Sequence, residues 1–195
     1  MKNTHIILFF LSAPLTPFAI NAGETQVSLG LGVSDYRFSD SHGVSPLDDN
    51  AFGGSLQLTH YPYSRGAFNG EIFVGAGFGY VNYGTYDGKV ITQEPEADVA
   101  ERFSIPGEGP FVFLSSKYQT EAWFGKLDIG LMDWSNDIEV NNIVFKEDGT
   151  SVIYDVEVGY RASENVGLSI GLNTSSNNSN HAMLYYGKIT YSFPN

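Results

Sequence analysis

The chain has 195 residues, no cysteine, and 22 acidic against 10 basic side chains, which gives a formal net charge of −12. A negative surface repels phosphates, so nucleic acid is excluded as a partner class. Without cysteine the chain is neither a disulfide-stapled secreted domain nor a lipoprotein anchored through a cysteine.

Residues 1–22 have the pattern of a secretory signal peptide. Lys2 supplies the positive charge, and an apolar run of Ile, Leu and Phe follows it before two prolines. The run is shorter than the about 20 apolar residues that a helix needs to cross a bilayer. We therefore expect export, cleavage between Ala22 and Gly23, and a single domain formed by residues 23–195.

From residue 26 onward, apolar side chains alternate with small or polar ones. Successive side chains of a strand point to opposite faces, so a period of two predicts strands with one apolar and one polar face. Eight such segments are expected: 26–36, 54–61, 71–80, 111–118, 123–132, 152–161, 166–173 and 183–193. In the segment 111–118 both alternating sets contain apolar residues, so a β-bulge is expected there.

The connections between these segments alternate in length. Long polar segments follow the first, third, fifth and seventh strands, and they include 84–110 and 133–150. The other connections are short, such as 62–70. Outer-membrane barrels have short periplasmic turns and long extracellular loops. The sequence therefore predicts an all-β protein, an eight-stranded antiparallel up-and-down transmembrane β-barrel in a bacterial outer membrane. We expect a monomer with both termini in the periplasm.

Aromatic residues gather at the ends of the expected strands, as the two interfaces of a bilayer require. The expected periplasmic girdle contains Tyr61, Tyr63, Trp123, Tyr160, Tyr191 and Phe193, and the outer girdle Tyr36, Phe38, Tyr80, Tyr83 and Trp134. Between them the apolar faces would contact membrane lipid and lipopolysaccharide. In the last strand, Tyr191 and Phe193 are expected to serve the barrel assembly machinery as well.

Charged residues fall on the side of the strands that would face the barrel interior. They are Glu71, Lys126, Asp128, Asp155, Glu157, Arg161 and Lys188. The interior of an eight-stranded barrel is just wide enough to be filled by side chains, and a buried charge without a partner is costly. We expect an interior salt-bridge network. The alternative is a narrow ion path.

Several stretches resemble the barrels related to the transmembrane domain of outer-membrane protein A. They are residues 123–137, 154–170 and the terminal stretch 186–193. The resemblance implies the same eight-stranded fold and says little about function. We expect no peptidoglycan-binding domain after the barrel, and the sequence has Pro194-Asn195 after the terminal aromatic residue. In layout the chain is more similar to the compact adhesion and colonisation barrels of the accessory colonization factor A type.

The favoured function is non-enzymatic: display of four extracellular loops for adhesion to a host surface or matrix ligand, or for envelope integrity. Loops bind by shape and chemistry on a rigid scaffold. The second loop is the longest and carries the acidic recognition candidates Glu94, Glu96, Asp98 and Glu101.

An enzyme that modifies lipid A is the alternative class. His42 and His181 lie near serines in expected outer loops, whereas His60 lies at the periplasmic end. A catalytic triad is recognised by geometry, not by proximity in sequence. No metal-binding spacing is present, and neither a cofactor nor a metal is expected.

Overall fold

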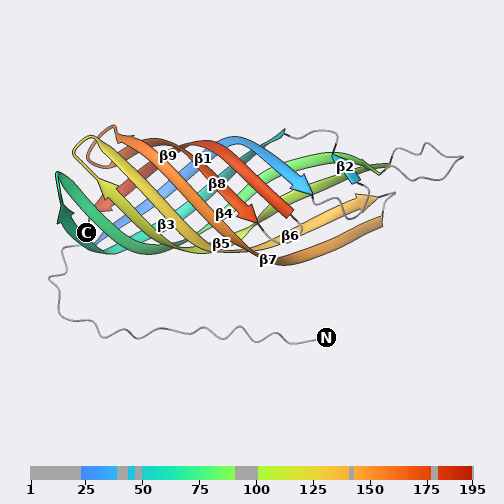
Figure 1. The fold of residues 1–195 in the computed structure, drawn as a ribbon, viewed down its shortest axis with the longest axis horizontal. Coiled ribbons are helices and arrows are strands. Elements are labelled where there is room, and N and C mark those ends of the chain that lie inside the picture. The colour runs from blue at the N-terminus through green and yellow to red at the C-terminus, as the bar shows by residue number, and fades with distance from the viewer. Residues whose placement is uncertain are drawn as a thin grey trace, which may run out of the picture.

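The computed structural model describes residues 23–38, 44–46, 50–90, 101–140, 143–176 and 180–194. These residues form antiparallel strands that wind around a common axis (Figure 1). The strands are β1 (Glu24–Phe38), β2 (Val44–Pro46), β3 (Asn50–Ala67), β4 (Gly70–Val90), β5 (Glu101–Gln119), β6 (Trp123–Val140), β7 (Ile143–Arg161), β8 (Val166–Ser176) and β9 (Asn180–Pro194). No helix in the described part of the chain is long and apolar enough to cross a membrane.

The strands close into a barrel. Going around the wall, the order is β1, β3, β4, β5, β6, β7, β8 and β9, and β9 pairs with β1 again. The short β2 lies outside this ring and pairs with the end of β4. All pairings join antiparallel strands, mostly neighbours along the chain. The predicted eight-stranded up-and-down transmembrane barrel is therefore confirmed.

The period-two pattern sets the two sides of the wall. On β7, Ser151, Ile153, Asp155 and Glu157 are buried in the lumen, whereas the side chains between them are exposed on the outside. The outward apolar run Val152–Tyr160 has a length close to the about 9 to 11 residues that a tilted strand needs to cross a bilayer. This exposed apolar surface is the lipid-facing band of the barrel.

The two ends of the barrel differ. At the end that we call the turn end, short turns join β3 to β4, β5 to β6 and β7 to β8. At the opposite end, called here the hairpin end, the paired strands β4–β5 and β6–β7 project beyond the other strands (Figure 1). In the β3–β4 turn Phe68 has a φ of 53° and is fully exposed.

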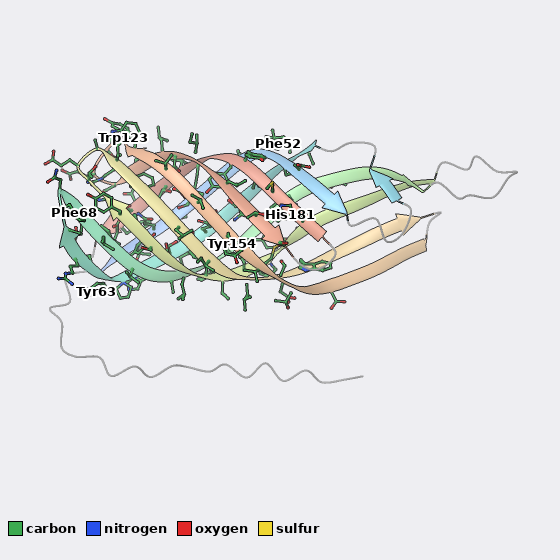
Figure 2. The ribbon with its side chains drawn as sticks, in the orientation of Figure 1. Phe52, Tyr63, Phe68, Trp123, Tyr154 and His181 are labelled. Carbon is green, nitrogen blue, oxygen red and sulfur yellow. The ribbon has the colours of Figure 1, made fainter. Side chains whose placement is uncertain are left out.

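Aromatic side chains border the lipid-facing band. Figure 2 shows Tyr63, Phe68 and Trp123 near the turn end, and Phe52 and Tyr154 farther along the barrel. Trp123 packs edge-to-face on Tyr160, with ring centroids 5.4 Å apart. Tyr191 and Phe193 pack in the same way at 4.7 Å.

Three residues expected in these girdles face the interior instead. Tyr61 and Tyr83 are buried in the lumen, and Trp134 is partly buried against the apolar cluster inside the barrel. Their assignment to the girdles is wrong, because position near a strand end does not decide on which side of the wall a residue lies. Tyr36 and Phe38 lie in β1, in a part whose side chains are outside the description.

The bulges are not where the sequence indicated. β5 alternates regularly, with Phe111, Phe113, Ser115 and Lys117 inward, so the bulge expected in 111–118 is wrong. Both alternating sets of β5 contain apolar residues because its inward residues Phe111 and Phe113 belong to an apolar cluster inside the barrel. One irregularity instead lies between His60 and Tyr63 of β3, where it places Pro62 inside a strand.

The expected long loops 84–110 and 133–150 are shorter than predicted, because most of their residues continue the strands. Pairing of β4 with β5 reaches Val90 opposite Glu101, and pairing of β6 with β7 reaches Val140 opposite Ile143. A second irregularity separates Asn82 from Thr85 on β4, and there Gly84 adopts a φ of 91°. Only glycine takes up such a backbone conformation without strain.

Candidate functional site

The interior of the barrel near the hairpin end is filled by a buried apolar cluster. It contains Val81, Tyr83, Phe111, Phe113, Met132, Ile153, Ala182, Leu184 and Tyr186, with Trp134 packed against it. Inward glycines make room for several of the rings: a Cβ at Gly79 would meet the Phe111 ring, and a Cβ at Gly77 the Phe113 ring. Tyr83 reaches across the lumen from β4 and donates a hydrogen bond of 2.5 Å to Asn173 on β8.

A charged network occupies the middle of the lumen. Lys188 Nζ lies 2.7 Å from Glu157 Oε2 and 3.4 Å from Asp155 Oδ2. Lys126 Nζ lies 2.8 Å from Asp128 Oδ2. Both lysines and all three carboxylates are buried. In this layer two ammonium groups therefore face three carboxylates.

Neutral polar side chains connect the two halves of this network. Gln57 on β3 accepts hydrogen bonds from Lys126 and Lys188 at 3.1 and 3.2 Å, and it donates one of 3.1 Å to Asp155. Tyr186 and Asn173 also donate to Asp155. Asp155 on β7 thus accepts hydrogen bonds from three other strands, β3, β8 and β9. Such satisfied networks hold an interior in one arrangement.

A second ion pair crosses the lumen near the turn end. Lys117 Nζ on β5 lies 2.7 Å from Glu24 Oε2 on β1, and Gln26 donates to the other Glu24 oxygen at 2.9 Å. The same ammonium group lies over the ring of Phe73, 4.1 Å from its centroid, and 4.9 Å from that of Tyr61. These rings and the charge pair lie inside the barrel near the turn end, where Glu24 and Gln26 also line a small hollow.

The structure places the seven interior charges expected from the sequence in two groups. Lys126, Asp128, Asp155, Glu157 and Lys188 meet in the central network. It does not bring Glu71 and Arg161 there. Both are half-buried at the turn end, where Arg161 donates to the backbone oxygen of Glu164 and lines a small hollow.

Sequence reasoning missed Lys117, Glu24 and Gln57. The signal for Lys117 was present: a charged residue cannot face lipid cheaply, so it marks its alternating set on β5 as inward. Glu24 was missed because the first strand was expected to begin two residues later, and Gln57 because only charged side chains were considered.

Of the four acidic recognition candidates, the structure describes only Glu101, which lies at the hairpin end. Glu101 is the first residue of β5 and pairs with Val90, whereas Glu94, Glu96 and Asp98 lie outside the described residues. Of the signal cleavage residues, Gly23 precedes β1 and Ala22 lies outside the described part.

The histidines considered for catalysis are separated from one another. His60 is exposed on the outer side of β3 and shares a hydrogen bond with Thr25, and His42 lies outside the description. His181 is the register partner of Ser176 across β8 and β9, but no hydrogen bond joins these two described side chains. Among the described residues no group of His, Asp or Glu could hold a metal ion.

Comparisons with known proteins identify the fold. No protein-family model and no curated protein matches this chain. Among solved structures, the chain is similar to Ail, the attachment invasion locus protein of Yersinia pestis, in complex with the heparin analogue sucrose octasulfate. The TM-score is 0.58 at 13% identity, over 89% of this chain and 100% of Ail. A second structure of Ail gives a TM-score of 0.57 at 14% identity over the same shares of both chains.

The outer membrane protein OprG from Pseudomonas aeruginosa is similar as well, with a TM-score of 0.53 at 11% identity over 90% of this chain and 98% of OprG. These similarities agree with the closed sheet and the lipid-facing band. The chain has the fold of the small outer-membrane β-barrels.

Proposed function

We propose that this protein is a non-enzymatic barrel of a bacterial outer membrane that displays its hairpins outside the cell for attachment to a host surface or matrix. The main observation in support is that the paired strands β4–β5 and β6–β7 project beyond the lipid-facing band. The neighbouring strand β8, in contrast, ends at Ser176. Such an extension adds nothing to the crossing of the membrane. It offers surface to a partner on a rigid scaffold.

In the proposed orientation the turn end and both termini face the periplasm, after removal of residues 1–22. This follows the division between short periplasmic turns and long extracellular connections. The apolar cluster, the charged network and the Lys117–Glu24 pair follow one another along the lumen. Side chains in these places argue against transport through the barrel and for a role of its outer surface. Pore formation is therefore not proposed.

The name of Ail refers to attachment and invasion, and one of its structures contains a sulfated heparin analogue. An equivalent ligand does not suit the present chain. Its net charge is −12, and a polyanion would be repelled. We propose that the host or matrix partner presents positive charge to the hairpins.

The proposal is tested by trimming each hairpin. Residues 85–106 or 136–147 are replaced by a Gly-Asn turn, and bacteria displaying each variant are compared for adherence to cultured epithelial cells and to matrix-coated plates. The barrel should still migrate faster when unheated than when boiled, because its closed ladder resists detergent. Adherence should fall to the level of bacteria without the protein.

Two results would favour the alternatives. Unchanged adherence together with increased sensitivity to detergents would point to envelope integrity. Removal of acyl chains from lipid A by the purified barrel, lost in His181→Ala, would establish the enzyme alternative.

A further inference from the structure

The hollow at the turn end lies inside the barrel wall, between six strands and the turn that joins β7 to β8. The residues that line it include Glu24, Gln119, Phe124, Arg161, Glu164 and Ser192. Phe124 is buried and Glu164 is exposed, so the hollow reaches from the interior to the solvent. Its volume of about 20 Å³ gives room for one small group. A ligand would therefore enter with the end of a chain.

The wall of this hollow contains hydrogen-bond donors without acceptors. Arg161 Nη2 donates to the backbone oxygen of Glu164 at 3.2 Å, and no carboxylate of the described residues forms an ion pair with the guanidinium group. A guanidinium group has five N–H donors, so most of them have no protein acceptor. The half-buried side chain of Gln119 also has no hydrogen-bond partner within the described ranges.

The buried acceptors of the hollow, in contrast, are already used. One oxygen of Glu24 accepts a hydrogen bond from Lys117 at 2.7 Å, and the other accepts one from Gln26 at 2.9 Å. Ser192 Oγ accepts a second hydrogen bond from Gln26 at 3.1 Å. Because its donors are available and its buried acceptors are occupied, the hollow is complementary to a group that accepts hydrogen bonds.

The backbone around Arg161 is held in place on two sides. The Arg161 N–H donates to the oxygen of Ala122, just before β6, at 2.8 Å. In the turn after β7, the oxygen of Asn165 accepts from the Ser192 N–H of β9, also at 2.8 Å. A site that is ordered before its ligand arrives loses little conformational freedom on binding.

We propose that this hollow binds a single carboxylate group of a peptide, with Arg161 and Gln119 as its donors. A planar carboxylate matches the fork of a guanidinium group and can accept two parallel hydrogen bonds from it. In the proposed orientation the hollow opens toward the periplasm, so the peptide would belong to a periplasmic partner. The site lies apart from the hairpins and goes beyond the proposed function.

Charge and size decide against two other ligands. A phosphate carries more negative charge than a carboxylate, and it would approach Glu24 and Glu164 in a chain with a net charge of −12. A cation would meet the guanidinium group of Arg161, whereas the buried carboxylate of Glu24 already has the ammonium group of Lys117 as its partner.

The test uses the full barrel in nanodiscs of zwitterionic lipid. The probe is N-acetyl-Ala-Ala-Ala, and its C-terminal amide is the matched neutral peptide. NMR follows two reporters: the backbone amide of Asn165 and the side-chain Nε–H of Arg161, one of four arginines in the sequence. We expect both signals to shift saturably with the acid and not with the amide.

The variants are read from the amide signal of Asn165. Arg161→Met should abolish the saturable shift. Arg161→Lys should weaken binding by about tenfold, because an ammonium group cannot make the paired contact. Gln119→Leu should weaken binding as well. A peptide amide whose only carboxylate is a glutamate side chain shows whether a side-chain acid is bound like a C-terminal one, and binding of either acid supports the proposal.

Matched controls lie at the same end of the barrel. Arg65→Met removes an exposed arginine that does not line the hollow, and binding should stay unchanged. Glu164→Gln should bind the acid at least as tightly. All variants should remain heat-modifiable. The proposal is overturned by equal binding of the peptide amide, by tighter binding of inorganic phosphate, by equal loss in Arg65→Met, by a loss in Glu164→Gln, or by no saturable shift.

The result does not depend on the proposed attachment role. Both ends of the barrel are accessible in a nanodisc, so the carboxylate site is tested whichever end faces the periplasm. If trimming the hairpins leaves adherence unchanged, the attachment role is wrong and the site at the turn end is unaffected.

Discussion

Lys117 and Glu24 join two nearly opposite walls of the barrel, since β5 and β1 are separated by β3 and β4 along the shorter way around the wall. Lys117 is only 1% exposed and has its charged partner at 2.7 Å. The pair also links β1, the first strand, to β5 across the lumen. The ladder between β1 and β9 closes the wall, and this ion pair adds a link across the lumen at the turn end.

Removal of one partner of this pair is the first prediction. Glu24→Ala leaves a buried ammonium group without its counter-charge, and the free energy of unfolding should fall by about 3 to 5 kcal/mol. The double variant Glu24→Ala/Lys117→Met should recover most of this loss. Urea unfolding in lipid vesicles measures both. Glu164→Gln, an exposed acid at the same end, is the control, and an equal loss there would contradict the prediction.

The second prediction compares how much two residues of the central network, Lys188 and Asp128, contribute to stability. Lys188→Met leaves Asp155 and Glu157 without their ammonium partner, and it should cost about 3 to 5 kcal/mol. Asp128→Asn instead balances two lysines with two carboxylates, and Lys126 keeps its hydrogen bond to Gln57. Lys126 loses its nearest carboxylate but stays in a layer with two carboxylates, so the cost should be smaller, about 1 to 2 kcal/mol. The free energy of unfolding in urea measures both variants. An equal loss in Lys188→Met and Asp128→Asn would contradict this prediction.

Inward glycines supply the third prediction, a graded series. A Cβ at Gly159 would overlap the ring of Phe124 and approach the Leu168 backbone oxygen, so Gly159→Ala should destabilise by about 1 to 3 kcal/mol. At Gly167 the nearest atoms belong to the Phe124 ring at 3.1 Å, and the loss should be smaller. At the outward Gly187 nothing lies within 4 Å, and alanine should be tolerated. A different order in thermal unfolding would disprove this account.

The fourth prediction concerns the edge-to-face pair Tyr191 and Phe193. Their replacement by aspartate should leave the chain unassembled in the periplasm, because the last strand then presents charge where it must enter lipid beside β1. A charge near the interface costs only about 0 to 1 kcal/mol for a cation, so stability alone would not reject the variant. Tyr191→Trp/Phe193→Leu should assemble. Surface labelling of intact cells distinguishes these outcomes, and normal display of the aspartate variant would refute an assembly role.

The fifth prediction is the absence of a sizeable steady conductance in planar bilayers. The apolar cluster and the charged network occupy consecutive parts of the lumen, and we expect side chains packed at the usual interior density to block a continuous path of water. Large conductance steps from the wild type that disappear in Lys126→Met would instead support an ion path.

Much of the wall was predictable from alternation alone. In 152–161 one set of residues is apolar and the other is polar or small except for Ile153, so strand, faces and lipid-facing side follow from a local pattern. The prediction failed in 111–118, where both sets contain apolar residues. The charge of Lys117 marks the set of Phe111 as inward, but the apolar half of the lumen that receives Phe111 and Phe113 exists only once the sheet has closed.

The sequence by itself determined that this chain is a β-barrel with charges inside and aromatic residues at its borders, because those features repeat every second residue. Only the tertiary structure decided that Lys117 meets Glu24, that Gln57 joins Lys126 to Lys188, and that Tyr61 and Tyr83 point into the lumen. These contacts join strands far apart in the chain. Their partners are set by register and by closure, which no local periodicity encodes.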